Sequence, residues 1–336
     1  MNPAFRNCTP GIALFSICAL CSCHHTGSGG GQAVPASAQE ANPAGPSRAD
    51  AQRTTAMLEL LRDILIRTAV EKDVGKRMQY YVPNAISMPE YQPTLEGVDA
   101  ISQYYGAIFS RQNVQRFERR IGEVLELEGT IVEIGSFRLE YTDAQGGEAL
   151  PQEGKYWNVW ARQANGGLKI KAETWGYFQP IKDPAALTVE IPPGAARPSR
   201  RKLDEQGENL RFELHALNAL MKEAVLNHDT ELRLGFFTRD AVFMPHADAN
   251  KSGIDEIRKY LIEYNTRSVV LEAARIETFE FERVGDHAIE YPRFNVKWRV
   301  PELSGVASGK GIRLWKRQHG GALKIFREIA THDFQR

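Results

Sequence analysis

The sequence has little of three things: cysteine outside its amino terminus, long apolar runs, and charge of one sign in excess. All four cysteines fall within the first 23 of its 336 residues. The rest of the chain therefore has no disulfide, no thiolate nucleophile and no cysteine metal site. The 42 Lys and Arg residues balance 42 Asp and Glu residues, whereas nucleic-acid binders carry a basic stripe. No stretch reaches the roughly 20 apolar residues of a membrane-spanning helix.

The motifs of several enzyme classes are missing as well. The eight histidines form no H-x-x-H or H-x-x-x-H pair, and there is no G-x-S-x-G turn. The segments Gly154-Lys155-Tyr156 and Gly309-Lys310-Gly311 lack the glycine spacing and the Ser or Thr of a phosphate-binding loop. We therefore expect no metal site and no cofactor.

The cysteines that are present lie in a segment typical of export. Arg6 precedes an apolar run from Ile12 to Leu20, which leads into Leu20-Cys21-Ser22-Cys23. This order resembles the bacterial lipoprotein signal, with residues 1–22 as the signal peptide and Cys23 as the acylated residue. The resemblance implies a membrane partner held through acyl chains, in the periplasm or at the cell surface. The alternatives are an ordinary cleaved signal or a misassigned start codon.

Two segments have the composition of connectors. Residues 23–53 are rich in Gly, Pro, Ala and Ser, cannot bury a core, and predict a flexible tether. Residues 181–204 combine prolines with a basic stretch and predict a linker. The remaining chain divides into two domains, over residues 54–180 and 205–334.

The strongest signal is an internal repeat. Met88-Pro89 and Met244-Pro245 lie 156 positions apart, and the same offset relates Gly97 to Gly253. Near the carboxyl end of each copy the offset becomes 155. Further ordered matches include Tyr104 with Tyr260, Arg111 with Arg267, Trp160 with Trp315, Arg162 with Arg317, and Glu173 with Glu328. The number of ordered matches predicts a duplicated domain.

Both copies have the same expected order of elements. Apolar residues recur every three or four positions from about Thr55 to Lys72 and from about Glu205 to His228, which predicts a first helix. Asp73 and Asp229 suit the N-cap of a short second helix, and a third helix follows the repeated glycine. Long strands with glycine-rich turns complete each copy. Helices followed by antiparallel hairpins indicate an α+β fold.

This pattern resembles the nuclear transport factor two-like superfamily, which includes ketosteroid isomerase and SnoaL-like polyketide cyclases. The residues that carry the likeness are Asn84–Pro89, Asp240–Pro245 and the closing hairpins Trp160–Ile170 and Trp315–Ile325. The resemblance implies two tandem cone-shaped domains, each with three helices on a curved antiparallel sheet and an apolar pocket. The superfamily contains enzymes and non-enzymes alike, so activity does not follow from it. Met88-Pro89 stands where an isomerase would have its carboxylate base, which argues against steroid isomerisation.

Strand parity suggests how the copies meet. Counting from a turn at Asn165-Gly166 places Trp157 on an apolar face toward the helices, and Trp160 and Trp315 on the opposite face. We predict that the copies pack sheet to sheet as an intramolecular pseudo-dimer with these two tryptophans at the seam. The alternative is that each copy covers its own tryptophan. The same parity predicts that Glu173 and Glu328 belong to a solvated charge ladder.

Few residues are candidates for function. Glu90 and His246 occupy matching positions after Met-Pro, at the expected mouth of each cone, and are weak catalytic candidates against an alternative as loop residues. Arg327 falls on the apolar face, where a charge needs a partner or a ligand anion. The other ligand-binding candidates are aromatic: Tyr81, Tyr104, Trp157 and Tyr260.

The leading interpretation is an exported, lipid-anchored protein that binds a small apolar or amphipathic molecule without catalysis, or that acts as an envelope interaction module. The alternative is an enzyme of cyclase, isomerase or hydrolase type that uses a polar group at a cone mouth. A third interpretation is a structural pairing module whose cones are filled by side chains.

Overall fold

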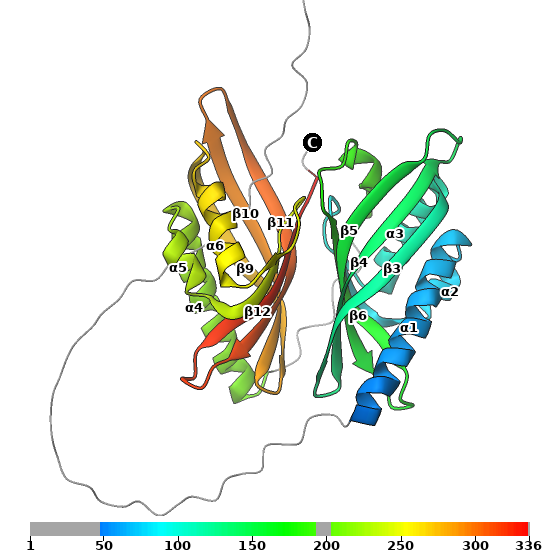
Figure 1. Ribbon diagram of the computed structural model, residues 1–336, viewed down its shortest axis with the longest axis horizontal. Coiled ribbons are helices and arrows are strands. Elements are labelled where there is room, and N and C mark those ends of the chain that lie inside the picture. The colour runs from blue at the N-terminus through cyan, green and yellow to red at the C-terminus, as the bar shows by residue number, and fades with distance from the viewer. Residues whose placement is uncertain (1–47, 193–202, 335–336) are drawn as a thin grey trace, which may run out of the picture.

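Two units of the same topology follow one another along the chain (Figure 1). The computed structural model describes residues 48–192 and 203–334; the predicted signal peptide, Cys23 and most of the predicted tether lie outside these residues. The elements of unit 1 are α1 (Arg48–Val70), α2 (Val74–Met78), β1 (Tyr81–Pro89), β2 (Leu95–Glu96), α3 (Val98–Arg111), β3 (Gln112–Leu127), β4 (Thr130–Asp143), β5 (Leu150–Arg162), β6 (Leu168–Tyr177) and the 3-10 helix η1 (Pro184–Leu187).

Unit 2 repeats this order without the 3-10 helix among its described residues. Its elements are α4 (Glu205–Leu226), α5 (Thr230–Leu234), β7 (Phe237–Met244), β8 (Lys251–Ser252), α6 (Ile254–Asn265), β9 (Val270–Val284), β10 (His287–Val300), β11 (Leu303–Arg317) and β12 (Leu323–His332). The strand orders, β2-β1-β6-β5-β4-β3 and β8-β7-β12-β11-β10-β9, are identical once the repeat is taken into account. The predicted α+β fold in two units is confirmed.

One strand pair in each sheet is parallel, whereas we expected every pair to be antiparallel. β1 pairs with β6, and β7 with β12, in parallel, while the other neighbours are antiparallel. The pairing is parallel because the third helix and the long hairpins lie between the two strands in sequence and return the chain in the same direction. Each sheet is therefore mixed.

Local signals in the sequence account for the helix starts. Asp73 accepts a hydrogen bond from the backbone N–H of Lys76 at 2.8 Å, and Asp229 does the same for Leu232 at 3.1 Å, so both are the expected N-caps. The repeated glycines, Gly97 and Gly253, have φ of 85° and 81° before the third helix. A side chain is strained in that backbone conformation, which explains the glycine at both places.

Each unit has its own core between the helices and one face of its sheet. In unit 1 this core includes Leu58, Leu65, Ile101, Ile170 and Trp160. In unit 2 it includes Leu214, Met221, Ile257, Ile325 and Trp315. In Figure 1 the helices lie on the outer side of each sheet, and the two sheets face each other.

A third apolar cluster, here called the seam, joins the facing surfaces of the two sheets. Unit 1 contributes Met88, Trp157 and Val159, among others, and unit 2 contributes Met244 and Ile312. These side chains are all almost completely buried, with Trp157, Val159 and Ile312 at 0% exposure. The area removed from water between the units is apolar, which stabilises their contact.

The tryptophans predicted for the seam do not lie there. Val159 pairs with Ala172, but the next pair is Trp160 with Ile170, so Lys171 is a bulge on β6. β12 has the same irregularity, because Leu314 pairs with Arg327 and Trp315 with Ile325. The extra residue reverses the parity along the strand. Trp160 and Trp315 consequently face the helices of their own units, and Trp157 takes the seam position.

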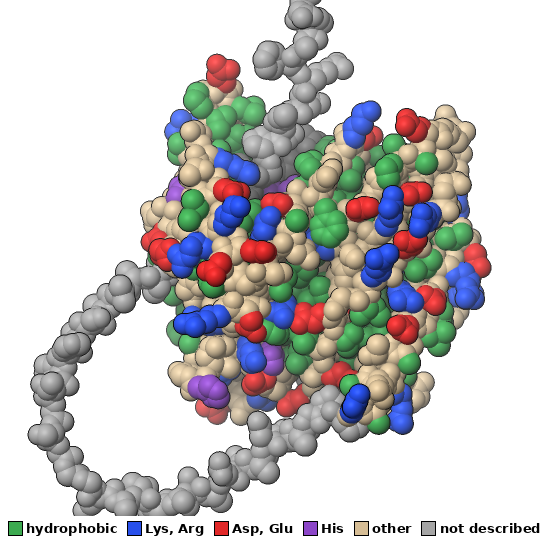
Figure 2. Space-filling view, in the orientation of Figure 1, with side chains coloured by type: hydrophobic (Ala, Val, Ile, Leu, Met, Phe, Trp, Pro, Cys, Tyr) green, Lys and Arg blue, Asp and Glu red, His purple; other side chains and the backbone are tan. Residues whose placement is uncertain are grey.

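The visible surface mixes charges of both signs. Figure 2 shows Lys and Arg side chains interspersed with Asp and Glu over both units, without a field of one sign on this face. Over residues 48–192 and 203–334, no helix is long and apolar enough to cross a membrane. No group of His, Cys, Asp and Glu in that part of the chain could hold a metal ion.

Candidate functional site

Unit 1 encloses a cavity of about 110 Å³ between α3 and the concave face of its sheet. Aromatic side chains are the largest group in its wall, and the predicted ligand-binding residue Tyr104 is one of them. From α3 come Tyr104, Tyr105 and Phe109; the sheet contributes Phe117, Phe137, Tyr156, Trp175 and Tyr177. Such walls suit a flat apolar group, because aromatic rings offer large apolar contact with a defined geometry.

A buried carboxylate, Glu173, organises one side of the cavity. It accepts hydrogen bonds from the hydroxyls of Tyr81 and Ser87, both at 2.8 Å, and of Tyr105 at 2.9 Å. Arg77 donates to the hydroxyl oxygen of Tyr105 at 2.9 Å. Burial raises the pKa of Tyr81 and Tyr105, so both stay protonated donors. The prediction that Glu173 belongs to a solvated charge ladder is wrong, because the bulge at Lys171 turns it inward.

A second buried carboxylate, Glu133, is bonded to the cavity wall. It accepts hydrogen bonds from the Tyr156 hydroxyl and the Trp160 indole N–H, both at 2.7 Å, and from the Asn158 amide at 3.3 Å. The guanidinium of Arg119 lies 3.7 Å from the centre of the Tyr156 ring. A buried N–H needs an acceptor, and Glu133 is the acceptor for the Trp160 indole, which explains why Trp160 lies inside its own unit.

Two side chains that line the cavity keep a buried polar atom without a partner among the described residues. Gln152 donates its Nε2 to the Tyr141 hydroxyl at 3.0 Å, but its Oε1 is unpaired. Arg77 donates through both terminal nitrogens, but its Nε is unpaired. Unpaired buried polar atoms are costly, so an acceptor and a donor in one cavity point to a polar ligand group.

A segment that the sequence assigned to the linker contributes to the wall of the cavity. Residues 181–191, here called the strap, include η1, and Leu187 lines the cavity at 4% exposure. The Gln92 side-chain amide makes two hydrogen bonds with the Val189 backbone, at 2.7 and 3.0 Å. Arg111 donates to the Thr188 carbonyl at 3.0 Å. The first half of the predicted linker is therefore part of unit 1.

A buried arginine occupies the centre of unit 2. Arg313, which stands in the place of Asn158, has its Nε 2.5 Å from Glu328 and its Nη1 3.5 Å from Glu290. Arg313 also donates to the Asn218 side-chain oxygen at 3.0 Å, and Asn218 donates to Glu290 at 2.6 Å. This guanidinium satisfies both carboxylates from within the unit.

The hydroxyl donors of unit 1 have no counterpart in unit 2. Phe237 and Leu261 occupy the positions of Tyr81 and Tyr105 in the repeat. Tyr260, predicted to bind ligand, packs in the core of unit 2 against Phe243 and Tyr264. Glu328 was expected to be solvated and is buried.

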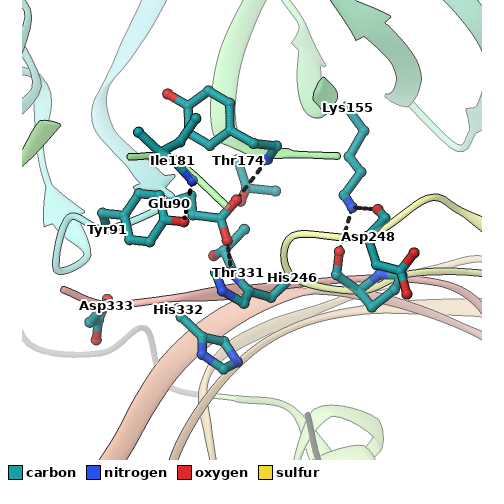
Figure 3. Close-up of polar contacts among 12 residues, drawn as sticks. Glu90, Tyr91, Lys155, Thr174, Ile181, His246, Asp248, Thr331, His332 and Asp333 are labelled. Atoms are coloured by element: carbon teal, nitrogen blue, oxygen red, sulfur yellow. Dashed lines mark hydrogen bonds and ion pairs between the residues drawn. The ribbon is translucent and has the colours of Figure 1, made fainter. Parts of the chain in front are cut away.

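The weak catalytic candidates meet at the contact between the units rather than at the mouths of two cones (Figure 3). The carboxylate of Glu90 contacts Nδ1 of His246, and the other Glu90 oxygen accepts the Tyr177 backbone N–H at 2.7 Å. Two residues at equivalent places in a repeat touch each other only near the axis that relates the copies. Glu90 and His246 therefore mark an approximate two-fold axis, and neither lines the cavity of unit 1.

A histidine stack continues this contact. The rings of His246 and His332 lie 4.2 Å apart and nearly parallel. Burial and the neighbouring His246 and Lys310 lower the pKa of His332 well below its usual value. Lys155 donates to the Pro245 carbonyl and, at 2.5 Å, to the Asp248 carbonyl. These polar contacts hold backbone and side chains from both units in one cluster.

The remaining predicted residues do not line the cavity. Nε and Nη2 of Arg327 each donate to a carboxylate oxygen of Glu123 at 2.7 Å. The anion that binds Arg327 is therefore a side chain of unit 1 and not a ligand. Trp157 is buried in the seam and does not line the cavity. Tyr81 acts through Glu173 and does not line the cavity either.

Sequence reasoning missed the polar residues of the cavity. Arg77, Arg119 and Gln152 stand in helical or alternating patterns where they pass for surface side chains. Asn158 and Arg313 are aligned in the repeat but differ in size and charge. This difference in the sequence could have indicated that the centres of the two units differ.

Comparison with known proteins gives likeness to solved structures only. No protein-family model matches the chain, and no curated protein matches it. A ketosteroid isomerase-like protein from Erwinia carotovora atroseptica matches 37% of this chain over 96% of its own, with 15% identity and a TM-score of 0.35. A conserved protein from Planctomyces limnophilus matches 38% over 99%, with 8% identity and a TM-score of 0.35. A nuclear transport factor two-like superfamily protein from Salmonella enterica serovar Typhimurium matches 38% over 92%, with 13% identity and a TM-score of 0.33. Each of these structures corresponds in length to one unit of this chain.

Proposed function

We propose that the protein binds a small amphipathic molecule in the cavity of unit 1 and that unit 2 is its closed structural partner. The observation that carries this proposal is the difference between the two centres. In unit 1 the cavity has aromatic walls and an unpaired acceptor, Oε1 of Gln152. In unit 2 the side chain of Arg313 satisfies the buried carboxylates. A concave apolar site with a few polar groups is the usual form of a ligand site.

Binding is favoured over catalysis by the state of the acidic groups. Glu173 and Glu133 each accept three hydrogen bonds from neighbouring side chains, so neither is free to take a proton from a substrate. Glu90 and His246 lie at the contact between the units, outside the cavity. An enzyme of cyclase, isomerase or hydrolase type would need a base that faces the ligand.

We also propose that the protein is exported and anchored in the bacterial cell envelope through acyl chains on Cys23. This rests on the sequence around the Leu20-Cys21-Ser22-Cys23 segment, which lies outside the described residues. Metabolic labelling with an alkyne fatty acid should tag the wild-type protein and leave a Cys23→Ala variant untagged. Equal labelling of the two proteins would contradict the proposal.

The repeat supplies the test of binding. Asn158→Arg copies the unit 2 arrangement into unit 1 and should fill the cavity, because Glu173 and Glu133 offer the new guanidinium the partners that Arg313 has. We expect native mass spectrometry to find small molecules bound to the wild-type protein and lost in this variant, with the melting temperature retained. Asn165→Arg, in an exposed hairpin turn, is the matched control and should keep the ligand. Retention of ligand by Asn158→Arg would place the site elsewhere.

A further inference from the structure

We infer that the ligand of unit 1 is a small aromatic acid whose ring lies among the aromatic side chains and whose carboxylate binds Arg119. This inference rests on the proposed binding function and names the chemical class of the ligand. Three observations support it: the size of the cavity, the state of Arg119, and the unpaired oxygen of Gln152.

The size and walls of the cavity fit a single ring. Its volume of about 110 Å³ is of the same order as the engineered apolar cavity of roughly 150 Å³ that takes up benzene. Tyr105 and Trp175, which both line it, are nearly parallel, with an interplanar angle of 24° and ring centres 6.1 Å apart. Further aromatic side chains line the cavity from β3, β4 and β5.

Arg119 lines the cavity and forms no ion pair with a described residue. Two arginines on the exposed side of the same hairpin are paired, Arg116 with Glu118 and Arg138 with Glu140. The ion pairs within residues 48–192 and 203–334 do not include Arg119, whose guanidinium is half-buried against the Tyr156 ring. A guanidinium that lies over an aromatic ring and forms no ion pair with a described residue is suited to bind a carboxylate through two hydrogen bonds.

Arg77 does not compete for this role. Its terminal nitrogens donate to the Leu65 carbonyl at 3.0 Å and to the Tyr105 hydroxyl at 2.9 Å. Its charge lies next to the Glu173 network, which compensates it. Arg119 lies over Tyr156, whose hydroxyl donates to Glu133. Of the two cations, Arg119 is the one whose terminal nitrogens donate to no backbone carbonyl among the described residues, so it is better placed for a ligand carboxylate.

The sheet register places a second polar side chain, Gln152, where the far end of the same ligand would lie. Arg119 pairs with Phe137, and Phe137 pairs with Gly154, so Gln152 is two strands across and two residues along from Arg119. Standard strand spacings then give about 12 Å between the two Cα atoms. Both side chains line the cavity, and the distance between their Cα atoms suits a ligand with one aromatic ring and a polar group at each end. A ring hydroxyl would donate to the unpaired Oε1 of Gln152, which makes a hydroxylated aromatic acid the preferred ligand.

Isothermal titration calorimetry with three probes tests the inference on the purified protein. We expect 4-hydroxybenzoate to bind more tightly than benzoate, and benzoate more tightly than phenol. Arg119→Gln should weaken binding of both carboxylates at least tenfold and change phenol binding by less than twofold. Arg119→Lys, which keeps the charge and loses the planar fork, should fall between. Arg120→Gln, on the exposed side of the same strand, is the matched control and should bind all three probes as the wild type does.

The outcomes separate this inference from the proposed function. If phenol binds but the carboxylates gain nothing over it, or if Arg119→Gln and Arg120→Gln bind benzoate equally, the assignment of an aromatic acid is wrong and the binding function stands. If none of the probes binds to the wild-type protein, the inference is overturned. If, in addition, Asn158→Arg leaves the population of co-purifying small molecules unchanged, the proposed function falls with it.

Discussion

Asn158 and Arg313 occupy the same place in the two copies, and the size and charge of this one side chain decide what each unit can hold. The short amide of Asn158 donates to Glu133 at 3.3 Å and leaves the cavity beside it open. The longer Arg313 reaches Glu328 and Glu290 and closes the corresponding space. Glu133 and Glu290 both accept the indole N–H of the tryptophan of their own unit, but the acids of unit 2 are also paired with the guanidinium of Arg313.

Lys155 provides a pH test at the scale of one residue. Burial lowers the pKa of Lys155 to about 8, although Glu90 and Asp248 oppose the shift. In the unfolded chain the pKa of a lysine is about 10.4, so between these values the unfolded state binds more protons than the folded state and stability increases with pH. We expect the unfolding free energy of the wild type to rise relative to Lys155→Met from pH 8 to pH 10.

The measurement is chemical denaturation of both proteins at pH 7, 8, 9 and 10. Groups other than Lys155 titrate alike in the two proteins, so their effect cancels in the difference. A difference that stays constant over this range would show that Lys155 is not desolvated at the contact between the units.

At the scale of elements, the bulges on β6 and β12 and the strap determine what faces the cavity. The bulge at Lys171 allows the same strand to place Ala172 in the seam and Glu173 in the centre of unit 1. The strap covers the cavity through Leu187. It is held by polar contacts to Gln92 and Arg111 and by the Thr188 hydroxyl, which donates to the Tyr91 carbonyl at 2.9 Å.

Removing the Gln92 amide should loosen the strap. Gln92→Ala loses the two hydrogen bonds to the Val189 backbone and leaves buried backbone groups unpaired. We expect faster hydrogen–deuterium exchange in residues 181–191, by roughly tenfold for a loss of about 1.4 kcal/mol. Gln115→Ala, at an exposed position of β3, is the control. Unchanged exchange in Gln92→Ala would mean that other contacts hold the strap.

The elements were predictable from the sequence where the signal is local. The caps Asp73 and Asp229 and the turn glycines Gly97 and Gly253 gave the helix starts, because each acts on its immediate neighbours. The bulge at Lys171 left no local mark, since one extra residue in a strand does not change its composition. The predictions that Trp160 and Trp315 lie in the seam and that Glu173 and Glu328 are solvated depended on parity across the bulges on β6 and β12 and were wrong for that reason. The cavity residues could not be predicted because they meet only through long-range strand pairing.

At the scale of the whole molecule, the two units form one body around an approximate two-fold axis. Glu90 and His246 meet at this axis, and ion pairs cross the contact on either side, Arg327 with Glu123 and Lys171 with Glu282. The apolar seam lies between these polar contacts. The duplication gave each sheet a second sheet to pack against within the same chain. The repeat in the sequence made this sheet-to-sheet packing predictable, but not the residues that form it.

A charge in the seam should separate the units and leave their separate cores intact. Met88 is 1% exposed among side chains of both sheets, and Met88→Glu would bury an unpaired carboxylate. We expect a larger radius of gyration by small-angle X-ray scattering with little change in far-ultraviolet circular dichroism. Leu60→Glu, on the exposed side of α1, is the control. The same radius and the same melting temperature in Met88→Glu and Leu60→Glu would contradict the seam.

The most direct test of the account is the number of ligand molecules bound per chain. Because unit 1 has an open centre and Arg313 fills that of unit 2, native mass spectrometry at saturating 4-hydroxybenzoate should find one ligand per chain and none in Asn158→Arg. Two ligands per chain, or one that persists in Asn158→Arg, would show that the units do not differ in the way their centres suggest.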